Sequence, residues 1–297
     1  MATDLRLGIT YVPYLPPEHL RDLAQAADEC GVDDLWVWED CFKQSGLASA
    51  SAALAWTSRI RVGIGLMPVP LRNVALTAME ISTLCRLFPD RLLPGIGHGV
   101  QPWMQQVGGK VDSPLTLLRE YATALRRLLA GETVSVDGRY VQLDAVALDW
   151  PPSTPPPLAL GGEGPKSVAL AGDLADVYLF SAARTDEEIA ATYEILTERW
   201  RARGIDPANR PQVVLAPITA TGPGARQRVD AEIPYWFKDP APSIGSAGDA
   251  EQVAADFRRL AGLGVTTLAV QPTRDEPDLL GLVEFLGREV RPLLAAD

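Results

Sequence analysis

Short apolar runs alternate with longer amphipathic segments along the chain, and this alternation restricts the fold more than any other feature. Turn residues bound each short run, as they bound buried β-strands, while the segments between carry apolar residues at helical spacing. The expected strands are 5–11, 34–38, 60–67, 91–97, 158–160, 177–180, 213–220 and 267–270. Eight strands that each precede helical sequence predict an α/β fold, specifically a (β/α)8 TIM barrel.

The segments between these strands are predicted to be helices. In residues 114–129, Leu118, Tyr121 and Leu125 recur at the period of an amphipathic helix. An open, doubly wound sheet is the alternative, but the first expected strand is not followed by the glycine-rich turn of dinucleotide-binding folds. The expected helices are 18–30, 49–56, 74–87, 114–129, 165–171, 186–203, 250–263 and 279–291.

Two stretches interrupt this repeat and predict insertions after the fourth and seventh strands. Residues 133–141 alternate in polarity around Asp137-Gly138, a dipeptide typical of a β-hairpin turn. Residues 222–246 are expected to be irregular. The proline-rich stretch 151–157 is flanked by the same repeat on both sides and is therefore not a domain linker. We expect a single barrel domain over residues 1–297.

Composition excludes several classes of protein. The 297 residues carry a formal net charge of −11, and no basic stripe is present, so a nucleic-acid partner is not expected. Three scattered cysteines predict neither a disulfide framework nor a zinc site, and two distant histidines make a metal site improbable. Neither a signal peptide nor an apolar run of about 18 residues is found. We expect a soluble, cytoplasmic protein without a membrane partner.

Active sites of such barrels lie at the C-terminal ends of the strands. Glycine dominates those positions in this chain, which suits the close approach of a flat ligand to the backbone. The residues at the expected strand ends are Tyr11, Glu39, Asp40, Cys41, Gly65, Leu66, Gly97, His98, Gly99, Gly161, Gly162 and Ser181.

The run "LALGGEGPKSVAL" combines a strand end with a helix start. Gly164 precedes Pro165, and proline favours the first position of a helix. Free N–H groups there, with Lys166 and Ser167 adjacent, are suited to hold a phosphate. The alternative is that these glycines only turn the chain.

Few side chains at the strand ends are able to handle a proton. His98 lies between two glycines, and imidazole titrates near neutral pH, so it is either a catalytic group or a packed one. Glu39 and Asp40 are adjacent and point in opposite directions, so at most one of them serves as a base. Cys41 has no histidine near it in sequence and is expected to be unreactive. Trp236 belongs to an aromatic cluster that is either core or a cover over the pocket mouth.

Four segments resemble the luciferase-like flavin or deazaflavin oxidoreductases, in the correct order. They are "AADECGVDDLWVWED", "LAWTSRIRVGIGLMPVPLRNVALTAMEISTL", "FPDRLLPGIGHG" and "LALGGEGPKSVALAGDLADV". The resemblance covers residues 5–181 well and is thin beyond them. It implies a barrel that binds coenzyme F420 or FMN across its C-terminal strand ends, and a homodimer. The apolar character of helix 74–87 suits it to supply the dimer contact.

The resemblance also implies roles for individual residues. A bulge with a cis peptide under the coenzyme ring corresponds to Gly65–Leu66. The residues after strand four, Gly97, His98, Gly99 and Val100, correspond to those that line the ring and the substrate pocket. The phosphate arm corresponds to Gly161, Gly162, Gly164, Pro165 and Lys166, with Ser181 nearby. Tyr11, Glu39, Cys41 and Trp236 are further expected pocket residues.

The chain departs from the sugar-phosphate dehydrogenases of this family. Those enzymes carry a histidine after strand two and a glutamate after strand four, where this chain has Asp40 and Val100. We therefore expect hydride transfer between F420 and a different small organic substrate, with Asp40 and His98 as catalytic residues. The alternatives are an FMN-dependent monooxygenase, a non-catalytic flavin-binding or deazaflavin-binding protein, and a cofactor-free isomerase that uses Glu39 and Asp40.

Overall fold

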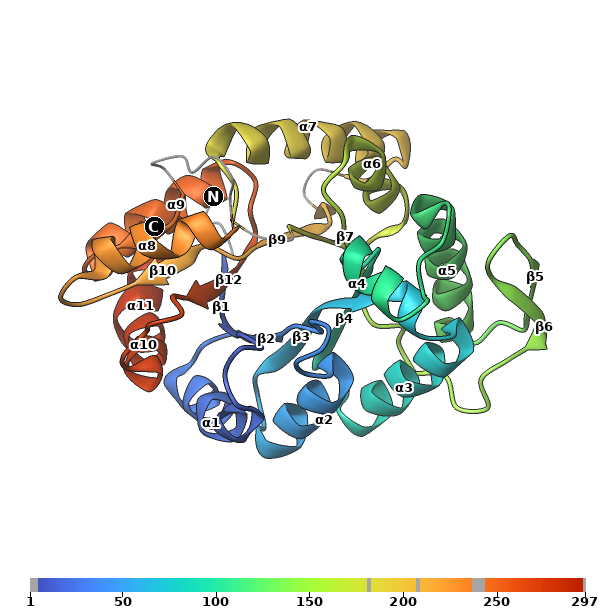
Figure 1. Cartoon of the computed structure of the whole chain (residues 1–297), viewed down its shortest axis with the longest axis horizontal. Helices are drawn as coiled ribbons and strands as arrows, with labels where there is room; N and C mark the ends of the chain where they lie inside the picture. Colours follow the sequence, from blue (N-terminus) through green and yellow to red (C-terminus); the bar gives the residue numbers. More distant parts are fainter. Residues whose placement is uncertain (1–4, 181–182, 207–208, 237–243, 296–297) are drawn as a thin grey trace.

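Eight parallel strands form a closed barrel, as the sequence predicts, and helices surround it (Figure 1). The computed structural model describes residues 5–180, 183–206, 209–236 and 244–295. Closure is set by the first and last barrel strands, which pair in parallel from Arg6 opposite Thr267 to Ile9 opposite Val270. An open sheet is thereby excluded. The barrel strands are β1 Arg6–Tyr11, β2 Asp34–Val37, β3 Arg61–Pro68, β4 Leu92–Gly97, β7 Ala159–Gly161, β8 Val177–Leu179, β9 Gln212–Leu215 and β12 Thr267–Pro272.

The helices begin and end close to the expected positions, and a capping side chain marks the start of most of them. Ser45 accepts a hydrogen bond from the N–H of Ala48 and so begins α2 three residues before the predicted start. Thr185 and Asp249 form capping boxes at the starts of α7 and α9. The helices around the barrel are α1 Leu20–Cys30, α2 Gly46–Trp56, α3 Val74–Leu87, α5 Pro114–Leu129, α6 Pro165–Leu174, α7 Asp186–Ala202, α9 Ala250–Gly262, α10 Leu279–Phe285 and α11 Arg291–Leu294.

The insertion after β4 consists of a short helix and a hairpin. Helix α4, Gln101–Gln106, directly follows the strand and was not predicted. The hairpin pairs β5, Val134–Asp137, with β6, Gln142–Val146, in antiparallel register, which confirms the hairpin predicted around Asp137-Gly138. It projects outward beyond α5 (Figure 1).

The insertion after β9 corrects two expectations. The predicted strand 213–220 is broken at Pro217, which has no N–H to continue a strand ladder, and its second part forms β10, Ile218–Ala220. Strand β10 pairs with the end of β12 and with β11, Ser246–Ala247. The stretch predicted to be irregular contains helix α8, Ala225–Trp236, which includes Pro234 in its last turn.

The inside of the barrel is filled mainly by one large side chain, the indole of Trp36. A Cβ atom on Gly63 would lie 2.4 Å from the indole, and one on Gly8 would lie 3.2 Å from it. Glycine on the two flanking strands therefore makes room for the ring. The other members of this inner cluster are Leu93, Ala159, Val177, Leu179, Val214, Ala216 and Ala269.

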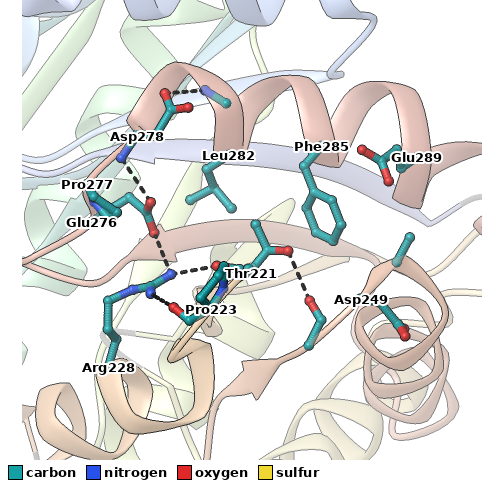
Figure 2. A pocket seen from close by; sticks show the side chains of 14 residues that line it. Thr221, Pro223, Arg228, Asp249, Glu276, Pro277, Asp278, Leu282, Phe285 and Glu289 are labelled. Carbon is teal, nitrogen blue, oxygen red and sulfur yellow. Dashed lines mark hydrogen bonds and ion pairs between the residues drawn. The ribbon is translucent and has the colours of Figure 1, made fainter.

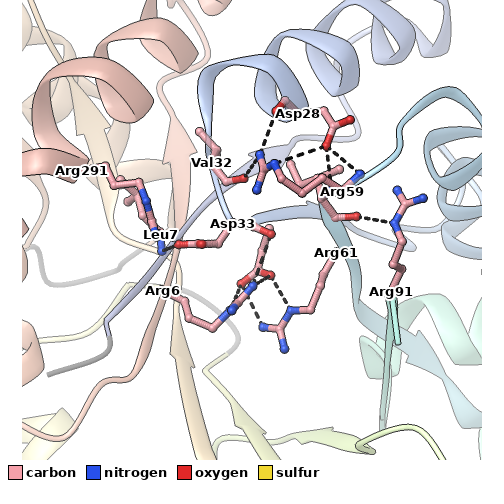
Figure 3. A network of polar contacts seen from close by, with 11 residues as sticks. Arg6, Leu7, Asp28, Val32, Asp33, Arg59, Arg61, Arg91 and Arg291 are labelled. Carbon is pink, nitrogen blue, oxygen red and sulfur yellow. Dashed lines mark hydrogen bonds and ion pairs between the residues drawn. The ribbon is translucent and has the colours of Figure 1, made fainter. Parts of the chain in front are cut away.

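A polar network closes the opposite end of the barrel, where the strands begin (Figure 3). The carboxylate of Asp34, which is almost fully buried, accepts hydrogen bonds from the guanidinium groups of Arg6 and Arg61 at 2.7–3.1 Å. Asp28 accepts the N–H groups of residues 58–60, which precede β3. These bonds fix the starts of the first three strands, so this end of the barrel serves stability.

Candidate active site

At the strand ends of β4 and β7, Gly97 and Gly161 leave room for the side chain of Leu66 from β3. A Cβ on Gly97 would lie 2.6 Å from Cδ2 of Leu66, and a Cβ on Gly161 would lie 2.5 Å from the same atom. Leu66 follows a register shift in the β3–β4 ladder, and the Gly65–Leu66 peptide is cis, as the resemblance implies. The three strands thus form a cradle that Cβ atoms would fill, and its chemistry fits the face of a planar ring.

His98 lies next to this cradle and is paired with a residue that sequence reasoning did not connect to it. Its Nε2 lies 2.8 Å from Oγ of Ser167, in the first turn of α6. Gly162 is close to both: a Cβ there would lie 2.6 Å from Cβ of Ser167 and 3.7 Å from Cδ2 of His98. Burial lowers the pKa of the imidazole, and the backbone carbonyl of Pro114 partly offsets this effect.

The loop from Gly162 to Lys166 has the features of an anion site. Gly164 is the N-cap of α6 and supplies no capping side chain, while Pro165 occupies the first turn, as predicted. Lys166 is exposed beside it. The hydroxyl of Tyr178 donates to the carbonyl of Gly162 at 2.8 Å, which holds the loop against β8. Ser181, the remaining predicted residue of the phosphate arm, lies outside the described residues.

Glu39 and Asp40 have different environments, as their opposite directions predict. Glu39 is buried, accepts the N–H of Gly46 at 3.0 Å and forms an ion pair with Arg72. Its carboxylate is therefore committed to joining α2 to the loop after β3. Asp40 lies 3.8 Å from Lys43, and burial raises its pKa against the opposing effect of that lysine. Of the two, Asp40 has the environment of a proton donor.

Three other residues that the sequence predicts to line the pocket differ in whether the structure supports that role. Tyr11 is buried in the core between the barrel and its helices, with its hydroxyl bonded to the carbonyl of Pro16, so we do not retain it as a pocket residue. Burial, followed by the nearby carboxylates, raises the pKa of the Cys41 thiol, consistent with an unreactive cysteine. Val100 is exposed after β4, next to the left-handed Gly99.

Trp236 covers the rim from the second insertion. Its indole meets that of Trp38, the residue after β2, edge to face at 5.7 Å between ring centroids. The buried carboxylate of Glu232 accepts a hydrogen bond from Trp236 Nε1 at 2.8 Å and pairs with Arg274 at 3.3 Å. The guanidinium of Arg274 in turn stacks on Tyr14, Tyr235 and Trp236. Of the two predicted roles of Trp236, this position favours the cover over the pocket mouth and not the core residue.

A cavity of about 670 Å³ is separate from these residues (Figure 2). It lies between the second insertion and the start of α10, with Leu282 and Phe285 on one side and Arg228 and Glu276 on the other. The Arg228 guanidinium donates to the carbonyls of Thr221 and Pro223 and lies 3.6 Å from Glu276. Arg228 and Glu276 thus neutralise each other, while Asp249 and Asp278 cap the starts of α9 and α10.

The fold and the glycine-lined rim define a barrel of the type that holds a planar redox coenzyme at its strand ends. The model of the luciferase-like monooxygenase family matches residues 3–268, and the chain belongs to this family. It is thus an oxidoreductase of that family, and the resemblance inferred from the four sequence segments is confirmed.

The similar proteins include both reductases and monooxygenases, according to their names. The 5,10-methylenetetrahydromethanopterin reductase of Methanolobus tindarius is 28% identical over 234 residues, which are 78% of this chain and 71% of that protein. The coenzyme F420 dependent tetrahydromethanopterin reductase of Methanopyrus kandleri superposes with a TM-score of 0.83 at 20% identity, over 98% of this chain and 99% of that one. An FMN-bound type II Baeyer-Villiger monooxygenase component of Pseudomonas putida gives 0.76 at 20% identity, over 97% and 98%.

Proposed function

We propose that this chain transfers a hydride between a small organic substrate and coenzyme F420 bound at the C-terminal rim of the barrel. The glycine cradle of β4 and β7 beside the Gly65–Leu66 bulge carries the proposal, because glycine backbone and the one apolar side chain of Leu66 allow a flat ring to approach closely. The name of the Methanopyrus reductase, which includes coenzyme F420, supports the choice of coenzyme. When bound, the deazaflavin ring accepts or donates the hydride.

Each part of the rim has a proposed role in holding the coenzyme. Gly97 and Gly161, with Leu66, support the ring. The uncapped start of α6 and the ammonium group of Lys166 bind the phosphate, because a helix N-terminus and a cation both favour negative charge. The Trp38–Trp236 pair shields the mouth from water.

Asp40 and His98 are the proposed proton-handling groups. Burial keeps the Asp40 carboxyl protonated to higher pH than an exposed aspartate, so it is suited to donate a proton. Burial also keeps the His98 ring neutral to lower pH, so it is suited to accept one. Glu39, occupied by Arg72, gives no support to the isomerase alternative.

An FMN-dependent monooxygenase is the second candidate, favoured by the FMN-bound structure of the same fold. Both coenzymes present a tricyclic ring and a phosphate, so the cradle fits either. A non-catalytic coenzyme-binding protein would share the same cradle.

Fluorescence titration of the purified protein with F420 and with FMN, side by side, tests these candidates. The proposal expects tighter binding of F420 and no oxygen consumption when the reduced coenzyme is added. Preferred binding of FMN with oxygen uptake would establish the second candidate. Binding without turnover of any tested alcohol, aldehyde or imine would favour the non-catalytic alternative, and absence of binding would refute all three.

We further propose that the chain forms a homodimer through α3 and acts in the cytoplasm. Three apolar side chains of this helix, Leu76, Met79 and Leu87, are exposed by 46%, 57% and 65%. Residues so spaced lie on one side of a helix. Among the described helices, none is long and apolar enough to cross a membrane. Light scattering coupled to size-exclusion chromatography should give twice the chain mass, and the M79E variant should give the monomer mass.

A further inference from the structure

The imidazole of His98 has a partner that can reverse its hydrogen bond on one side, and no hydrogen-bond partner among the described residues on the other. Its Nε2 lies 2.8 Å from the Ser167 hydroxyl, which is able either to donate or to accept a hydrogen bond. Its Nδ1 is buried and makes no well-formed hydrogen bond to any described residue. The backbone carbonyl of Pro114 nevertheless favours a proton on the ring.

Ser167 also belongs to the loop that we propose as the phosphate site. Its N–H already donates to the carbonyl of Gly164 at 2.8 Å, so the side-chain hydroxyl is the group that it has left for an anion. A hydroxyl has one proton. If that proton is donated to a phosphate oxygen, it is no longer available to His98, although the 2.8 Å contact between Oγ and Nε2 persists.

We infer that an anion bound at the start of α6 draws a proton onto His98 through the hydroxyl of Ser167, an inference that rests on the proposed phosphate site. Without the anion, Oγ–H donates to Nε2 and the neutral ring keeps its proton on Nδ1. With the anion, Oγ–H donates to a phosphate oxygen and Oγ offers a lone pair to Nε2, so Nε2 must carry a proton. Because the Pro114 carbonyl favours the protonated ring, this proton is added to the neutral ring to give the imidazolium. One proton passes from solvent to Nε2, and no other bond is formed or broken.

Other charged groups around His98 do not supply this effect. Lys166 neighbours Ser167 and opposes a second positive charge, while Glu163 is paired with Arg184 at 2.5 Å. From the α4 side, the uncharged Gln101 amide donates to the His98 carbonyl at 3.3 Å. The hydroxyl of Tyr178 is bonded to the carbonyl of Gly162. Ser167 is thus a positioning residue that gives the proposed acid–base group its proton when the phosphate is present.

The chain suits a direct test because it has two histidines, His19 and His98. NMR of 15N-histidine-labelled protein would follow both rings against pH, alone and with saturating inorganic phosphate, FMN or F420. We expect the His98 midpoint to rise by about one pH unit with each anion, as for a group whose protonated form gains a hydrogen bond. Its nitrogen shifts should change from a neutral tautomer to imidazolium. The exposed His19 is the internal control and should not move.

Three variants separate the hydroxyl from simple electrostatic attraction. S167A should lose most of the rise at saturating ligand, and S167T, which keeps the hydroxyl, should restore it. K166A should need more ligand to saturate yet reach the full rise. Calorimetry of phosphate binding in buffers of different ionisation enthalpy should show proton uptake that S167A abolishes.

The outcomes distinguish this inference from the proposed function. If F420 or FMN binds while the His98 midpoint stays fixed, or if S167A shifts as far as the unaltered protein, the inference is refuted and the proposed function stands. If neither coenzyme binds but inorganic phosphate raises the midpoint in a Ser167-dependent way, the proposed function fails and the link between the anion and His98 is supported.

Discussion

Alanine at Gly161 and alanine at Gly95 provide a matched pair that tests the cradle. Both substitutions add one methyl group at the inner face of neighbouring strands, but the new atoms meet different obstacles. At Gly95 the Cβ would lie 2.3 Å from the backbone oxygen of Ile64, which cannot move without disturbing β3. At Gly161 the nearest atom, at 2.5 Å, is Cδ2 of Leu66, the end of a rotatable side chain.

These distances set the expected magnitudes. An ordinary carbon–carbon contact needs about 3.5–4.0 Å, so Leu66 must withdraw by about 1.0–1.5 Å from the 2.5 Å contact at Gly161. An off-rotamer side chain costs about 0.5–1.5 kcal/mol, so G161A should be only slightly destabilised. G95A forces backbone movement and should lose about 2–3 kcal/mol, the upper part of the range for overpacking. In a chain of this size that lowers the melting temperature by about 3–5 °C.

Coenzyme affinity should follow the opposite order. The displaced Leu66 in G161A enters the space proposed for the ring, and we expect F420 to bind about tenfold more weakly, which corresponds to about 1.4 kcal/mol. The double variant G161A/L66A removes the obstruction and should recover most of the affinity. Thermal unfolding and fluorescence titration provide the two readouts. Unchanged affinity in G161A, or no recovery in the double variant, would refute the placement of the ring on β7.

Three further substitutions test other parts of the structure. K166A should weaken coenzyme binding about fivefold to tenfold with little change in turnover at saturation, as measured by steady-state kinetics; a large fall in turnover would contradict a purely phosphate-binding role. Burial favours a raised pKa for Asp34, but hydrogen bonds from Arg6 and Arg61 keep this pKa below its ordinary value. The ionised Asp34 therefore stabilises the folded state at neutral pH, and this stabilisation is lost as the pH falls through the folded-state pKa. D34N should therefore lose about 3 kcal/mol in urea unfolding at pH 7 and a smaller amount in strong acid. D40N should remove the limb of the pH–rate profile that Asp40 contributes, which we expect at higher pH than for an exposed aspartate because burial raises the pKa of this carboxyl; a profile that keeps this limb would exclude Asp40 as the acid.

The barrel could be predicted because each strand and helix carries its own local signal, whereas the contacts of the site could not. Ser167 and His98 lie 69 positions apart, and only the closed sheet places α6 beside the end of β4. The same holds for Arg72, whose pairing with Glu39 removed that carboxylate from the site. Helix α8 was missed because the glycines that flank it and the internal Pro234 are typical of loops. The contacts of its buried Glu232 could not be predicted either, because this carboxylate accepts the N–H of Arg274, which lies 42 positions further along the chain.

The indole of Trp36 sets the lower limit of the proposed active site. Because this ring fills the inside of the barrel and the glycines at positions 8 and 63 lie against it, a substrate has no route past the level of Leu66 and Leu179. Under the proposed function, recognition of different substrates then falls to the segments above this level that follow β4 and β9, namely α4 and α8. Changes in those two segments would alter which molecules react while the barrel beneath keeps its packing.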